Sequence, residues 1–103
     1  MNVENWTDEQ AIDAWLEYME ANRGRTVRTI EAYRAALMRL KEFMAGKPLV
    51  DADAMELEMF CGLWLHKKGV IARSRKPYIS AVKGFYAWLK AKGNVKGLSL
   101  IHI

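Results

Sequence analysis

Basic side chains recur at helical spacing in the last third of the sequence. If each residue advances a helix by about 100°, one face centred on Lys76 would carry Arg73, Ser80, Lys83, Ala87 and Lys90. No acidic residue follows Glu58, so carboxylates nearby in the sequence cannot neutralise these bases. Cationic side chains on one helical face, together with hydroxyls at helix starts, match the phosphates of nucleic acid. From the residues alone, an anionic partner and a basic surface that contacts only solvent are therefore both open.

Residues that could support catalysis or metal binding do not occur at the spacings that are typical of catalytic motifs or metal sites. His66 and His102 have no cysteine or carboxylate at metal-ligand spacing. The sequence contains no glycine-rich phosphate loop and no nucleophile elbow. Cys61 lies among apolar residues and is expected to be a buried structural thiol. We therefore expect no catalytic residue, no metal and no cofactor in this chain.

Acidic and basic residues alternate in blocks along the chain. The net charge is −6 over residues 1–22, +5 over 23–47, −4 over 48–66 and +9 over 67–103, which gives the overall +4. This alternation predicts a molecule with a basic face and an acidic back. The four tryptophans could stack on bases, but their helical spacing favours core packing.

Length and hydropathy indicate one helical domain. A chain of 103 residues is long enough for a single modest core. No apolar run approaches the roughly 20 residues that cross a bilayer, and the acidic start is unlike a signal peptide. These features predict a cytoplasmic protein without a membrane partner. No segment shows the alternation typical of strands, so the predicted fold class is all-α.

Four helices follow from the spacing of apolar residues. The expected ranges are 8–22, 26–45, 52–68 and 74–92. The expected N-caps are Thr7, Thr26, Asp51 or Asp53, and Ser74. The expected core residues are Ile12, Trp15, Leu16, Met19, Val27, Ile30, Tyr33, Leu37, Leu40, Met44, Met55, Met59, Phe60, Leu63, Trp64, Ile79, Val82, Phe85, Tyr86 and Leu89. Gly84 is expected to weaken the fourth helix slightly.

Three stretches are similar to one known domain family. TIEAYRAAL at 29–37 carries a hydroxyl followed by Tyr-Arg, and SRKPYISAVKGFYAWLKAKG at 74–93 carries Ser-Ala, a base and an aromatic pair. DADAMELEMFCGLWLHKKG at 51–69 matches the helix between them. These stretches resemble the core-binding domain of tyrosine recombinases of the phage-integrase family. The resemblance covers about residues 7–96.

This resemblance implies a four-helix, SAM-like orthogonal bundle over residues 1–96, followed at 97–103 by a tail or the start of a linker. In that family the domain forms half of a C-shaped clamp around double-stranded DNA at the recombination site, and a catalytic domain forms the other half. This chain is thus expected to bind DNA for integration or site-specific recombination without being an enzyme by itself. An isolated monomer and a full-length tetramer on DNA are expected.

The resemblance also implies which residues face DNA. On the second helix they are Thr26, Arg28, Thr29 and Arg34, and on the fourth they are Arg73, Ser74, Arg75, Lys76, Ser80 and Lys83. The hydroxyls are expected at phosphates near helix starts, and the bases at phosphates or groove edges. Arg75 is the candidate for contact with a base.

Two other functions fit the same basic helices. A SAM-like helical protein interaction domain would use them to bind an acidic partner surface. A stand-alone helical DNA-binding regulator would place one helix in the major groove, usually as a dimer.

Overall fold

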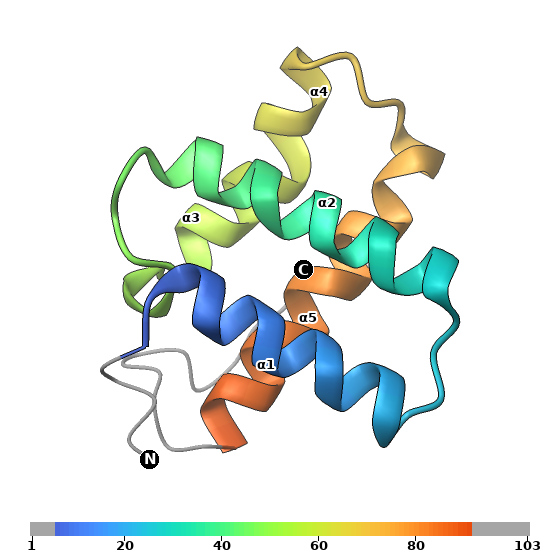
Figure 1. The fold of residues 1–103 in the computed structure, drawn as a ribbon. Coiled ribbons are helices and arrows are strands. Elements are labelled where there is room, and N and C mark those ends of the chain that lie inside the picture. Colours follow the sequence, from blue (N-terminus) through green and yellow to red (C-terminus); the bar gives the residue numbers. More distant parts are fainter. Residues whose placement is uncertain (1–5, 92–103) are drawn as a thin grey trace.

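The computed structural model describes residues 6–91, which form helices and turns with no strand among them (Figure 1). The helices are α1 (Asp8–Ala21), α2 (Val27–Met44), α3 (Ala54–Met59), α4 (Leu65–Lys67) and α5 (Lys76–Ala91). The shorter pieces are 3-10 turns at Leu49–Asp51 and Ala72–Arg75 and a π-helical turn at Phe60–Trp64. The predicted all-α, four-helix fold is confirmed, with α3, the π turn and α4 in place of the third helix. The expected tail at 97–103 lies outside the described residues.

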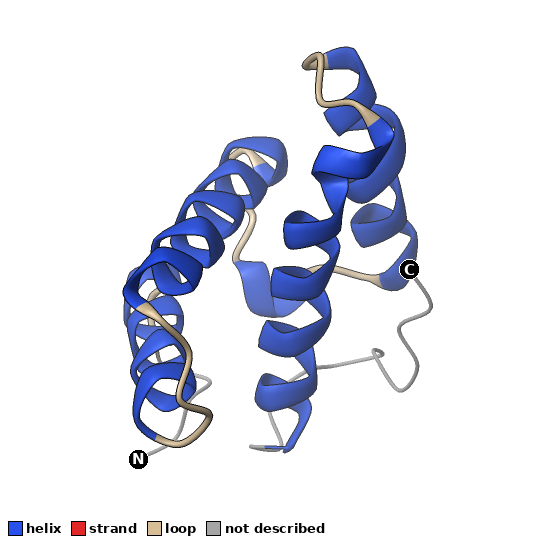
Figure 2. Cartoon of the chain, turned by 90° about the vertical axis from the view of Figure 1, so that its right-hand side faces the viewer, coloured by secondary structure: helices blue, strands red, loops and turns tan. Residues whose placement is uncertain are grey.

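One core joins the three longest helices. α2 packs against both α1 and α5, and α1 also contacts α5 (Figures 1 and 2). Trp15 of α1 is only 1% exposed, and its ring lies 5.4 Å from the ring of Tyr33 and 5.7 Å from that of Phe85, centroid to centroid. Aromatic contacts of this kind fix the positions of helices relative to one another. The core residues predicted on α1 and α5 are all buried or half-buried.

Gly84 lies on the face of α5 that meets this core. A Cβ atom at Gly84 would be 2.9 Å from Cζ2 of Trp15, which is closer than carbon atoms normally approach. The missing side chain therefore lets α5 pack directly on the indole ring. This contact offsets the loss of helix propensity that the sequence predicts for glycine.

Three of the predicted N-caps are confirmed, and one is wrong. The side chains of Thr7, Thr26 and Asp53 each accept a hydrogen bond from a backbone N–H in the first turn of their helix. Ser74 instead lies inside the 3-10 turn, and α5 begins at Lys76. The N–H of Ser74 donates to the carbonyl of Ile71 at 2.9 Å, so a backbone turn leads into α5 where a capping side chain was expected.

The third predicted helix is interrupted. The π-helical turn contains Gly62 and separates α3 from α4. The buried side chains of this segment include Leu57 and Leu65, whereas three residues predicted for the core are exposed: Met55 by 70%, Met59 by 46% and Leu63 by 52%. Apolar residues occur on more than one side of this segment, so spacing alone could not identify the side that packs.

α2 also exposes apolar side chains. Val27, which was predicted for the core, is 65% exposed. Val27 and Met38 are eleven residues apart, or about three helical turns, so they share an outward face. The remaining predicted core residues of α2 are buried or half-buried.

A buried polar link ties the loop after α2 to two helices. The Tyr86 hydroxyl of α5 donates to the carbonyl oxygen of Leu49 at 2.7 Å. The N–H of Leu49 donates to Oδ1 of Asp8, the first residue of α1, at 3.0 Å. Because Leu49 and Tyr86 are fully buried, these bonds satisfy backbone groups that water cannot reach.

Candidate nucleic-acid interface

Residues from α2 and from the start of α5 line one surface groove, here called the α2–α5 groove. Its volume is about 440 Å³, and Tyr33 is one of its lining residues. The residues in it that were predicted to contact DNA are Arg28, Thr29, Arg73, Lys76 and Ser80. The first turns of α2 and α5 both lie toward the right-hand side of Figure 1, which is the side that Figure 2 faces. The fold thus brings together five predicted site residues from two distant segments.

Helical periodicity explains why these side chains converge. Thr29 and Tyr33 are one turn apart on α2, and Lys76 and Ser80 are one turn apart on α5. Arg73 precedes them in the 3-10 turn. None of the lining residues is acidic, and among residues 6–91 no carboxylate pairs with Arg28, Arg73 or Lys76. The groove is therefore positively charged and suited to an anion.

Thr26 and Thr29 hold the start of α2. The Thr26 hydroxyl accepts from the N–H of Thr29 at 3.3 Å and donates to the Thr29 hydroxyl at 3.1 Å. Thr26 does not line the groove, whereas Thr29 does. Thr26 thus caps the helix that carries Arg28 and Thr29.

Arg34 lies on another side of α2. Its Nη1 donates to Oδ1 of Asp13 at 2.7 Å, and it shares a hollow with Glu17 and Glu20 of α1. Five residues separate Arg34 from Thr29, which turns it roughly 140° around the helix. Lys41 likewise pairs with Glu9 of α1, and the hydrogen bond from this lysine holds the pKa of Glu9 below its usual value. Arg28 of α2 therefore lies in the groove, whereas Arg34 and Lys41 pair with an acidic helix.

Arg75 closes the loop that precedes α5. Its Nε donates to the carbonyl of Val70 at 3.1 Å, and its Nη2 donates to Nδ1 of His66 at 3.3 Å. These two bonds hold the guanidinium against the loop and use Nε and one N–H of Nη2, so only the remaining N–H groups are left for the predicted contact with a DNA base. Ser74 is exposed beside it but does not line the α2–α5 groove.

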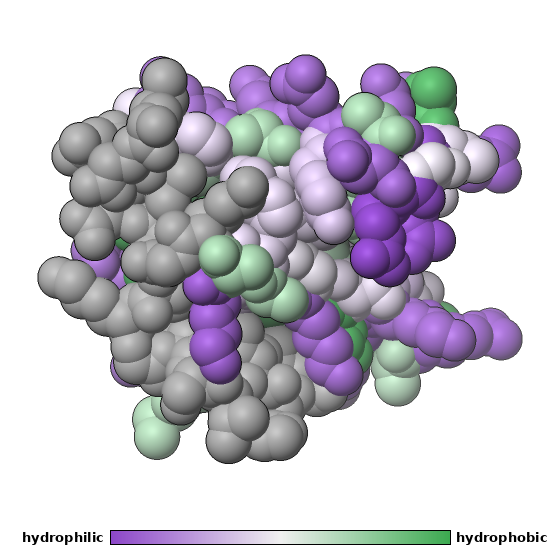
Figure 3. All heavy atoms as spheres, turned by 90° about the horizontal axis from the view of Figure 1, so that it is seen from below, coloured by the Kyte–Doolittle hydropathy of each residue, from purple (hydrophilic) through white to green (hydrophobic). Residues whose placement is uncertain are grey.

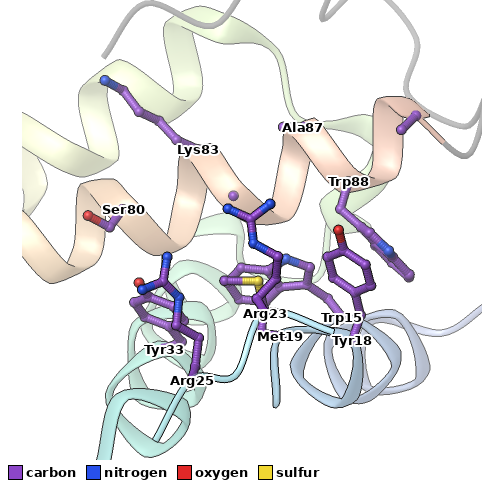
Figure 4. A pocket seen from close by; sticks show the side chains of 12 residues that line it. Trp15, Tyr18, Met19, Arg23, Arg25, Tyr33, Ser80, Lys83, Ala87 and Trp88 are labelled. Carbon is purple, nitrogen blue, oxygen red and sulfur yellow. The ribbon is translucent and has the colours of Figure 1, made fainter. Parts of the chain in front are cut away.

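A second hollow, here called the aromatic cavity, continues from the groove and has a volume of about 560 Å³. Tyr33 and Ser80 line both spaces. Lys83, a predicted site residue, lines the aromatic cavity together with Arg23 and Arg25 from the loop between α1 and α2 (Figure 4). Sequence reasoning assigned no role to either arginine. The sequence feature that could have pointed to these two arginines is their position on either side of Gly24, directly after the acidic first helix.

Hydrophilic side chains gather on the side of the molecule that carries these hollows. Seen from below, they project from the right-hand side, which is the side that Figure 2 faces (Figure 3). α1 carries acidic residues that pair with Arg34 and Lys41 on its own side of α2. The bases that pair with α1 are thus on a different side of α2 from Arg28 and the groove.

Two observations on residues 6–91 concern the Cys61 thiol and possible metal ligands. Cys61 is buried, and burial raises the pKa of its thiol to about 11, so it is not a nucleophile near neutral pH. No group of three or more His, Cys, Asp or Glu side chains that could hold a metal ion occurs within residues 6–91. None of the helices in that range is both long and apolar enough to cross a membrane.

Fold and groove define a small helical-bundle domain with a cationic surface groove, an arrangement suited to a polyanion. The sequence matches the phage integrase N-terminal SAM-like domain over residues 12–93, and the chain belongs to this family. The predicted family resemblance and the SAM-like fold are confirmed.

The chain is also similar to several curated recombinases. Tyrosine recombinase XerC of Xylella fastidiosa (strain 9a5c) is 31% identical over 87 residues, which cover 82% of this chain and 29% of that protein. XerC of Chromobacterium violaceum is 35% identical over 85 residues, with coverage of 82% and 28%. Tyrosine recombinase XerD of Rhizobium meliloti is 33% identical over 84 residues, with coverage of 80% and 27%. The chain therefore spans less than a third of these relatives. No solved structure matches it significantly.

Proposed function

We propose that this domain binds the double-stranded DNA of a recombination site through the α2–α5 groove, and so serves DNA integration or site-specific recombination. The observation that carries the proposal is the convergence of Arg28, Arg73 and Lys76 on one groove without a carboxylate. Thr29 and Ser80 add hydroxyls that can donate to phosphate oxygens. The similar proteins are named tyrosine recombinases, and we propose recombination as the DNA reaction on the basis of these names.

The site residues receive different roles in this proposal. Phosphate contact is assigned to Arg28, Thr29, Arg73, Lys76, Ser80 and Lys83. Thr26, Arg34 and Arg75 instead position the helices and loop that carry those contacts, because each is hydrogen-bonded within the fold and lines neither the groove nor the aromatic cavity. Contact between Ser74 and a phosphate stays a prediction.

The proposal extends to the longer protein that the relatives represent. We infer that the groove holds DNA against a catalytic domain of the same full-length tyrosine recombinase, which cleaves the strands. The domain is then one half of a clamp, and half a clamp binds more weakly than two linked domains. A monomeric isolated domain, a tetramer on DNA and a cytoplasmic location stay predictions.

Salt dependence of duplex binding tests the proposal. If about five phosphates are contacted, log K should fall with log salt at a slope of about −4 to −5. Binding of a short labelled duplex is measured by fluorescence anisotropy between about 50 and 200 mM salt. The double variant Arg28→Gln, Lys76→Gln should weaken binding and make the slope shallower by about 2.

A matched pair of variants separates groove contact from overall charge. Lys47→Gln with Lys67→Gln removes the same charge from outside the groove and the aromatic cavity. We expect this control to bind almost as the unmodified chain does. Equal losses in both double variants would show that diffuse charge, not the groove, attracts DNA. No duplex binding at low salt would favour the protein interaction function.

A further inference from the structure

The aromatic cavity combines arginines with aromatic rings. Contact with the backbone of a duplex would not require these rings. Arg23 and Arg25 reach from the α1–α2 loop toward α5, while the rings of Tyr18, Tyr33 and Trp88 form walls below and beside them (Figure 4). No carboxylate lines this cavity, and within the part of the chain that the structure describes neither arginine has an acidic partner. A matching ligand therefore carries negative charge and a flat apolar group.

We propose that the aromatic cavity binds one nucleoside monophosphate unit. The guanidinium groups of Arg23 and Arg25 hold the phosphate, because their planar N–H donors suit phosphate oxygens. The base lies against the aromatic walls, since every base has a face that stacks on such rings. A volume of about 560 Å³ is within the range of small-ligand sites.

The walls of the cavity are already held in place. Tyr33 stacks on the buried ring of Trp15, with 5.4 Å between the ring centroids. Tyr18 contacts Trp88 at 6.4 Å. On α5, the exposed Ala87 places only a methyl group on the side of the cavity opposite these rings (Figure 4). A base that enters therefore does not have to order the side chains on which it stacks.

The cavity adjoins the proposed DNA site. Because Tyr33 and Ser80 line both spaces, an unpaired nucleotide of a strand lying in the α2–α5 groove can reach the cavity. This source of the nucleotide rests on the proposed function. A free mononucleotide has the same chemistry and does not depend on it.

The test follows the ¹⁵N-labelled chain by NMR during titration with thymidine monophosphate. The amides around Arg23 and Arg25 and the indole signal of Trp88 should shift together. Inorganic phosphate should bind at least about tenfold more weakly, because it cannot stack. Equal binding of phosphate and nucleotide, or no binding of the nucleotide, would overturn the proposal.

Two kinds of variant make the test specific. Arg23→Gln with Arg25→Gln should weaken nucleotide binding about tenfold, because both charge-assisted contacts are lost. Ala87→Leu, at an exposed position of α5, should block the base by filling its space while keeping both arginines. The pair Lys47→Gln, Lys67→Gln removes the same charge elsewhere and should bind normally. Unchanged binding by Ala87→Leu would contradict a base in this cavity.

A comparison of duplexes identifies the source of the nucleotide. A duplex with one unpaired terminal thymidine should bind more tightly than a blunt duplex, and Ala87→Leu should abolish the difference. Binding of the free nucleotide without this difference assigns the cavity to free nucleotides. If the blunt duplex binds at Arg28 and Lys76 but the nucleotide does not bind, the cavity proposal fails and the proposed function stands. If the nucleotide binds but the blunt duplex does not, the proposed function fails and the cavity proposal stands.

Discussion

Replacing Tyr86 with phenylalanine removes one hydroxyl from the centre of the fold. This hydroxyl donates to the carbonyl of Leu49 at 2.7 Å, and both residues are fully buried. Leaving a buried carbonyl without its partner costs about 1–3 kcal/mol. The free energy of unfolding should fall by that amount at pH 8, and the melting temperature by about 4–8 °C for each kcal/mol.

The size of this loss should depend on pH. Burial, with smaller contributions from Asp8 and Glu56, raises the pKa of folded Tyr86 far above the unfolded value of about 10. The stabilising contribution of the protonated hydroxyl is complete below pH 10 and is lost as the pH rises above it, because only the unfolded chain then ionises. The loss is about 1.4 kcal/mol per pH unit. Phenylalanine has no such loss, so the gap between the two proteins should narrow by about 1.4 kcal/mol at pH 11.

Urea unfolding followed by tryptophan fluorescence at pH 8 and pH 11 measures both quantities. Tyr78→Phe is the control, because within residues 6–91 the Tyr78 hydroxyl makes no hydrogen bond. We expect the control to change stability by less than about 0.5 kcal/mol at pH 8. A Tyr86→Phe protein as stable as the original at pH 8, or a gap that stays constant up to pH 11, would refute the reasoning.

Three further substitutions or reactions test the packing. Gly84→Ala should destabilise the fold by about 1 kcal/mol in urea unfolding, because overpacking on Trp15 exceeds the gain in helix propensity; a stabilised variant would disprove the close approach. Asp53→Ala should cost about 0.5–2 kcal/mol by removing the capping box with Glu56, and unchanged stability would count against it. Cys61 should react with a thiol reagent at pH 8 only as fast as the protein opens, whereas labelling at the rate of a free thiol would contradict its burial.

The sequence predicted best those features that neighbouring residues determine. Thr7, Thr26 and Asp53 cap helices through bonds to residues three positions ahead, so the pattern and the structure coincide. The apolar spacing of α1 and α5 likewise identified their buried faces, because each has one dominant apolar side.

Features that depend on a distant partner were not predictable from local pattern. Nothing near Arg34 in the sequence indicates that Asp13, on another helix, will pair with it. The bonds from Arg75 to Val70 and His66 depend on how the loop before α5 folds back. Arg23 and Arg25 became candidates only because the α1–α2 loop lies opposite α5.

The third helical segment shows a limit of periodicity itself. Apolar residues occupy several of its sides, and the π-helical turn at Phe60–Trp64 changes the angular relation between α3 and α4. Met55 and Leu63 therefore fitted a predicted core stripe but are exposed. Gly84 shows that helix propensity has the same limit. Its role in the fold is the close contact with Trp15, which its helix propensity does not indicate.

The most direct test of DNA binding in the α2–α5 groove is an NMR titration of the ¹⁵N-labelled chain with a short blunt duplex, first at low salt and then at physiological salt. We expect amide shifts around Arg28, Thr29 and the segment from Arg73 to Ser80, and we expect them to fade as salt rises. Shifts centred on the acidic face of α1, or no shifts at low salt, would contradict the assignment of this groove to DNA.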